Sequence, residues 1–187
     1  MSTRSTIAII KKDDTVEYIY CHSDGYLSYN GAILQTYYSD PEDVKKLISL
    51  GNMSSLGTKI VPKGEHSFDY NKREEGVCVY YGRDRGETGQ EPSKFKDFNE
   101  FYGHQDFQEY NYVYKEKNNK WYLFDEDALK LKPLKTMIKK IKDELPPEFR
   151  DDFINQLNKE KVEKDFNKLN KEVKSVVEVE TKVKYKL

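Results

Sequence analysis

Two pairs of short segments with alternating side chains constrain the fold of this chain most strongly. Residues 5–10 and 16–21 form the first pair, which is joined by a polar turn. Residues 110–115 and 121–124 form the second pair, which is joined at Asn118-Asn119. Strands connected by a short polar turn pair as hairpins. We therefore expect an α+β fold in which an antiparallel sheet organises residues 1–125.

Two helices are expected to pack on this sheet. Residues 31–38 form the shorter one. The second has clearer boundaries, because Asp40 is a good N-cap, Pro41 suits the first helical position and Gly51 suits the stop. Its apolar residues recur at helical spacing, at Val44, Leu47 and Ile48.

A strand over residues 77–81 is followed by the glycine-punctuated segment 82–89, which is expected to be a loop. Arginine offers a planar fork of donors that suits phosphate or carboxylate groups, so Arg83 and Arg85 are candidate anion-binding residues. Asp84 and Glu87 are candidate ligand contacts beside them. The alternative is that the arginines pair with these local acids and hold the loop shut. The segment lacks the Gly-Lys-Ser/Thr ending of a P-loop.

The turn after the second strand contains a second group of candidate ligand contacts. His22 and Asp24 are chemically suited to act as a base and the group that orients it. A structural role for both, in an ordinary turn, is the alternative. Tyr20 and Tyr26 flank them and complete the set of candidate ligand contacts.

The chain shows no clear signal for a metal or a cofactor, and we expect neither. Its two cysteines, Cys21 and Cys78, cannot make a disulfide framework. Together with His22, His66 and His104 they show no metal-binding spacing. Nothing resembles a signal peptide or a membrane span, so we expect a cytoplasmic protein that does not contact a membrane.

The composition changes at 125/126. Residues 1–125 carry a net charge of −4 and residues 126–187 one of +3, so we expect an α+β core domain followed by a lysine-rich helical extension. A helix is expected to open at Pro133 and to end before Pro146-Pro147. Six lysines without an acid among them are candidate contacts to a nucleic-acid backbone, although a solvated helix face is the alternative. They are Lys130, Lys132, Lys135, Lys139, Lys140 and Lys142.

A long helix is expected over residues 147–174. Its apolar residues form two stripes that are offset by one residue, so the helix as a whole is not a continuous heptad coil. The distal stripe needs the main domain or another protein to cover it. Residues 177–187 alternate strictly, which predicts a strand that adds to a sheet edge of this chain or of a partner, as in a homodimer.

Several sequence blocks in residues 1–125 resemble a family of small proteins encoded by bacteriophages and prophages. The blocks include Met1-Ser-Thr-Arg-Ser-Thr-Ile-Ala-Ile, Ile19-Tyr-Cys-His-Ser-Asp-Gly-Tyr and Tyr81-Gly-Arg-Asp-Arg-Gly-Glu-Thr. This chain departs from the usual pattern at Ser23, where the family has Trp, and at Leu27, where it has Pro. The resemblance implies a phage protein that acts in the cytoplasm of the infected bacterium. More particularly, the chain is similar to inhibitors of type III CRISPR complexes from staphylococcal phages.

The expected function is therefore a non-enzymatic counter-defence protein that binds a host defence complex, together with RNA. Two alternatives stay open. The first is a nucleotide-signal binding protein that uses Arg83 and Arg85. The second is a nucleotide-processing enzyme that uses His22 and Asp24.

Overall fold

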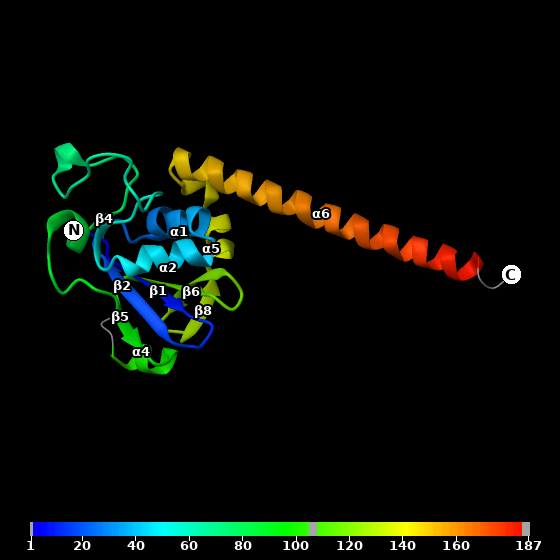
Figure 1. The fold of residues 1–187 in the computed structure, drawn as a ribbon, viewed down its shortest axis with the longest axis horizontal. Helices are drawn as coiled ribbons and strands as arrows, with labels where there is room; N and C mark the ends of the chain where they lie inside the picture. Colours follow the sequence, from blue (N-terminus) through cyan, green and yellow to red (C-terminus); the bar gives the residue numbers. More distant parts are fainter. Residues whose placement is uncertain (1, 105–107, 185–187) are drawn as a thin grey trace.

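The computed structural model describes residues 2–104 and 108–184, and within them eight strands form one mixed sheet (Figure 1). The strand order is β4-β3-β2-β1-β6-β7-β8. β5 lies on the same side of β2 as β3: β5 pairs with the first half of β2, and β3 pairs with its last residue. The strands are β1 (Ser5–Ile10), β2 (Val16–Cys21), β3 (Met53–Ser55), β4 (Val79–Tyr80), β5 (Ser93–Phe95), β6 (Tyr110–Lys115), β7 (Lys120–Asp125) and β8 (Lys130–Pro133).

Both expected hairpins are confirmed, and the α+β class is correct. β1 pairs with β2, and β6 pairs with β7, each in antiparallel register. The expectation of an antiparallel sheet is wrong at two places, because β1 runs parallel to β6 and β2 runs parallel to β3. The two hairpins meet through β1 and β6, and this pairing joins residues about a hundred positions apart, which no local pattern encodes.

Helices cover both faces of the sheet. One face carries α1 (Ala32–Tyr37), which follows a π-helical turn at Leu27–Gly31, together with α2 (Pro41–Ser49), α5 (Leu134–Lys140) and the start of α6 (Pro147–Lys184). The other face is covered by α4 (Phe98–His104). Successive residues of β1 alternate between these layers, since Ile7 and Ile9 pack in the first and Ala8 packs in the second.

The boundaries of α2 follow the expected capping chemistry. The Asp40 side chain accepts a hydrogen bond from the Glu42 N–H at 2.8 Å, and Pro41 occupies the first helical position. Gly51 follows the helix with a φ of +85°, and a Cβ there would lie 2.0 Å from the Gln90 carbonyl oxygen. Both the left-handed backbone and the close approach require glycine at this position.

The division expected at 125/126 falls inside the sheet. β8 pairs with β7, and α5 packs against the same core as α1 and α2. Five apolar side chains after residue 125 are buried in that core: Leu134, Ile138, Leu145, Phe149 and Phe153. The helix expected from Pro133 is divided into α5 and a short 3-10 turn at Lys142–Glu144. The body of the molecule therefore extends to about the first three turns of α6.

Beyond its first turns, α6 leaves the body and projects from it as a single rod (Figure 1). Its 38 residues correspond to a length of about 57 Å. The strand expected over 177–187 is wrong for residues 177–184, which continue the helix, and residues 185–187 lie outside the described residues. No proline or glycine interrupts the chain after Pro147, so helix propagation prevails over the alternating pattern.

Candidate functional site

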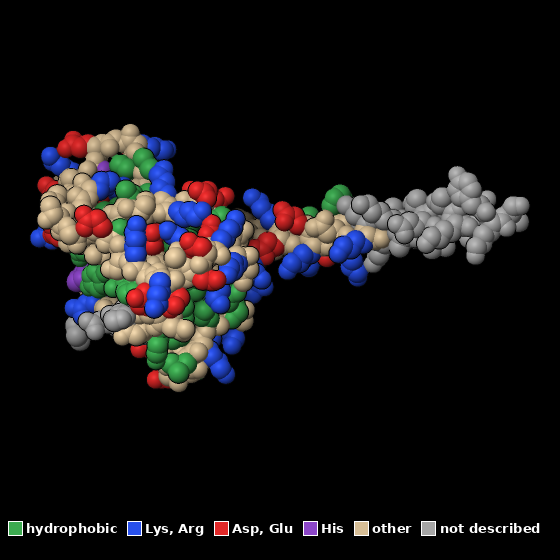
Figure 2. Space-filling view, turned by 60° about the horizontal axis from the view of Figure 1, so that its bottom comes forward, with side chains coloured by type: hydrophobic (Ala, Val, Ile, Leu, Met, Phe, Trp, Pro, Cys, Tyr) green, Lys and Arg blue, Asp and Glu red, His purple; other side chains and the backbone are tan. Residues whose placement is uncertain are grey.

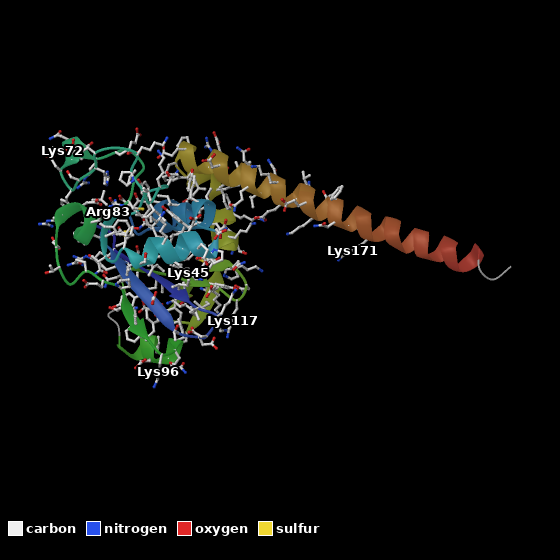
Figure 3. The ribbon with its side chains drawn as sticks, viewed as in Figure 1. Lys45, Lys72, Arg83, Lys96, Lys117 and Lys171 are labelled. Atoms are coloured by element: carbon white, nitrogen blue, oxygen red, sulfur yellow. The ribbon has the colours of Figure 1, made fainter. Side chains whose placement is uncertain are left out.

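The segment that was expected to be an arginine loop begins as a helical turn. α3 (Tyr81–Arg85) follows β4 directly and ends at Gly86, whose φ is +75°. The guanidinium of Arg83 donates to Asp84 Oδ1, to the Ile60 carbonyl and to the Cys78 carbonyl, each at 2.6 Å. It also lies 4.9 Å from the centre of the Tyr80 ring. Because these donors are already engaged within the protein, Arg83 holds α3 against Ile60 and Cys78 and is a poor anion-binding residue (Figure 3).

Asp84 is the centre of this arrangement. Its side chain is 3% exposed and accepts the Tyr80 N–H at 2.7 Å in addition to the Arg83 bonds. His66 Nε2 lies 3.6 Å from Asp84 Oδ2, and His66 Nδ1 accepts the Glu74 N–H at 2.9 Å. The buried carboxylate therefore connects β4, α3 and the 61–76 loop. For Arg83 this is the structural alternative, in which the arginine pairs with a local acid and holds the segment closed.

Arg85 is more accessible than Arg83. Its side chain is 52% exposed, pairs with Glu87 at 3.1 Å and lies over the Phe68 ring at 4.7 Å. Glu87 also accepts from the Gln90 amide at 3.3 Å. The structure therefore does not bring Arg83 and Arg85 together on one ligand, because one is internal and the other lies at the surface.

The turn after β2 does not assemble a catalytic pair. His22 Nδ1 is 2.9 Å from the Tyr20 hydroxyl, whereas Asp24 accepts from the Tyr26 hydroxyl at 3.3 Å. Burial raises the pKa of both tyrosines, so both hydroxyls stay protonated at neutral pH. No hydrogen bond joins His22 to Asp24 in the described part of the chain. The four candidate residues form two separate pairs.

Both cysteines are buried in the core. Burial raises the pKa of the Cys21 thiol to about 12 and also raises that of Cys78, so neither is a thiolate at neutral pH. Across residues 2–104 and 108–184 there is no cluster of three or more His, Cys, Asp or Glu side chains arranged to hold a metal ion.

The six lysines of the 130–142 run do not share one helix. Lys130 and Lys132 lie on β8, and Lys132 pairs with Asp125. Lys135 lies on α5 and pairs with Glu160 of α6. Four of the six, Lys130, Lys139, Lys140 and Lys142, are exposed and make no hydrogen bond or ion pair with a described side chain.

The contact between Lys135 and Glu160 places α5 beside α6 where the long helix leaves the body. Lys139 follows Lys135 by one helical turn, and two further exposed lysines, Lys161 and Lys164, follow Glu160 within four residues on α6. Figure 2 shows basic side chains around this junction and along α6, with acidic ones among them. We name the group the α5–α6 basic surface; it consists of Lys139, Lys140, Lys142, Lys161 and Lys164.

A groove of about 1180 Å³ lies between α1, the segment after β3, the 70–77 loop and the start of α6. Its walls carry more acids than bases: Asp24, Glu74, Glu75, Glu148 and Asp152 against Lys59 and Arg73. The Tyr37 hydroxyl donates to Asp152 at 2.5 Å, and burial together with this carboxylate raises the pKa of Tyr37. Of these residues only Asp24 was a sequence candidate. The walls come from five stretches of chain that are far apart in the sequence, and no residue spacing predicts that they meet.

No protein-family model, curated protein or solved structure matches this chain. Within the described residues, none of the helices combines the length and the apolar character that crossing a membrane requires. The long α6 is rich in charged residues throughout.

Proposed function

We propose that this protein is a non-enzymatic binding protein that holds RNA on the α5–α6 basic surface. The observation that carries the proposal is that Lys139, Lys140 and Lys142 are exposed and have no anionic partner among the described side chains, next to a long helix that leaves the body. Ammonium groups that are not neutralised within the molecule are available to phosphates.

Such a surface recognises RNA by its charge and its shape. Lysines on two adjacent helices follow a phosphate backbone without reading base edges. The overall charge of −1 means that the attraction is local to this surface and is not a property of the whole molecule.

The phage resemblance supplies the biological setting of the proposal. In that setting the RNA belongs to a host defence complex, and the protein inhibits the complex by occupying it during infection. The internal engagement of Arg83 and the separation of His22 from Asp24 favour this function over nucleotide-signal binding and over nucleotide processing.

The test is fluorescence anisotropy of a labelled single-stranded RNA with the full chain, over a range of salt concentrations. Replacing Lys139, Lys140 and Lys142 together by Glu should abolish measurable binding at moderate salt. Replacing the same lysines by Gln should lower the log–log salt dependence by about 2, since each phosphate contact contributes roughly 0.7 for a single strand.

The matched control replaces Lys12, Lys96 and Lys120 by Glu. These lysines are exposed, their side chains make no bonds within the described residues, and Lys96 lies at the opposite end of the body from α6 (Figure 3). The control changes the net charge equally and should keep most of the affinity. Equal losses in the two triple variants, or no RNA binding by the unmodified protein at low salt, would refute the proposal.

A further inference from the structure

The part of α6 that projects from the body has its own apolar pattern. Phe149, Phe153 and Leu157 pack against the body with a spacing of four residues. After a step of five residues, the spacing alternates between four and three over six apolar residues and one acid, Glu180: Val162, Phe166, Leu169, Val173, Val176, Glu180 and Val183. An alternation of three and four residues is the signature of a left-handed coiled coil.

The beginning of this repeat is exposed. Val162 is 67% and Phe166 is 62% exposed, and the body ends one to two turns earlier. Residues 162–184 are helical, so the repeat lies on one rod with its d positions at Val162, Leu169, Val176 and Val183 and its a positions at Phe166, Val173 and Glu180. A strand-mediated homodimer is not available to this segment, because it is a helix.

We propose that two copies of this chain associate through residues 162–184 of α6 as an antiparallel coiled coil. The argument for a second copy is that the segment is complementary to itself in one direction. When the two helices run antiparallel and a positions meet d positions, Phe166 lies at the level of Val183 of the other copy, and Val173 at the level of Val176.

The single acid in the repeat selects the antiparallel direction. In a parallel dimer in register, Glu180 would meet Glu180 of the other copy in the core, which places two like charges together. In the antiparallel dimer Glu180 is at the level of Leu169, and no like charges meet in the core.

Charges beside the core favour the same direction. At the e positions, Glu163 of one copy lies at the level of Lys184 of the other, and twofold symmetry repeats the pair. A parallel arrangement in register would place Asp165 beside Asn170 and Glu172 beside Val177, without an opposite-charge pair. The antiparallel arrangement also places the two bodies at opposite ends of the coil, so they do not collide.

Sedimentation equilibrium of the full chain tests the association. We expect a dimer of twice the 22.1 kDa chain mass. Phe166→Asp should convert it to a monomer whose body stays folded, which the fluorescence of the buried Trp121 reports. Leu129→Asp is the matched control, because Leu129 is 61% exposed in the turn between β7 and β8 and is no part of the repeat, and this variant should remain a dimer.

A charge exchange tests the direction. Glu163→Lys and Lys184→Glu should each raise the dissociation constant of the dimer by about five- to thirty-fold, since two symmetric pairs become repulsive. The double exchange should restore it. A protein that is monomeric at every concentration, or a dimer that survives Phe166→Asp, would overturn the proposal. A dimer whose dissociation constant is unchanged by both single exchanges would overturn the antiparallel arrangement.

Discussion

Replacing Phe153 by alanine removes a side chain that is fully buried where α6 packs on the body. Truncating a buried Phe costs about 3–5 kcal/mol, from lost apolar burial and from the cavity left behind. Since small domains are stable by only about 5–15 kcal/mol, Phe153→Ala should remove a large share of the stability. The physical reason is that the first turns of α6 form part of the core.

Urea unfolding followed by the fluorescence of Trp121 measures this cost. Trp121 is 3% exposed and its indole N–H donates to the Tyr38 carbonyl at 2.6 Å, so its emission reports the integrity of the body. Phe166→Ala is the control on the same helix and should change the unfolding free energy by less than about 0.5 kcal/mol, because Phe166 is 62% exposed. The comparison is made at low protein concentration, where association does not contribute. Equal costs for the two variants would show that α6 is not anchored as described.

Two further outcomes follow from the packing and the charges. Deleting residues 126–187 should yield unfolded protein, because it removes β8 and five buried apolar side chains whose burial contributes roughly 7–15 kcal/mol together. Deleting residues 162–187 should leave the urea midpoint of the monomer unchanged. A 1–125 fragment that is folded by circular dichroism would contradict this expectation. Glu116 pairs with Lys45 at 2.7 Å, which lowers the pKa of its carboxyl below the ordinary 4.5. Its stabilising contribution is therefore present at neutral pH and is lost as the pH falls through the folded-state pKa, so Glu116→Gln should flatten the acid limb of a plot of unfolding free energy against pH.

Structural elements that depend only on residues close together in the sequence could be predicted. The two hairpins depend on alternation and a polar turn, and α2 depends on Asp40, Pro41 and the apolar residues that follow. In each case the interacting groups are within a few residues of one another, so local preference and final structure agree.

Features that depend on distant partners could not be predicted in the same way. The charge change at 125/126 suggested a boundary, but Leu134 and Phe153 complete the core from beyond it. Lys130 and Lys132 fall on a strand because β7 offers an edge to pair with, which the lysine run does not reveal. The engagement of Arg83 depends on the carbonyl of Ile60, whose approach follows from the path of a long loop.

The pairing of β1 with β6 sets the order in which this molecule can assemble. Each residue of β1 meets a partner 105 positions later, from Ser5 with Tyr110 to Ile10 with Lys115. On the ribosome the first hairpin therefore waits with one edge open until the second has been synthesised, and the closure of so long a loop slows folding. During that interval the apolar residues of β1 are open to pairing with other strands. The first part of the protein to leave the ribosome is therefore the part that most needs protection from aggregation.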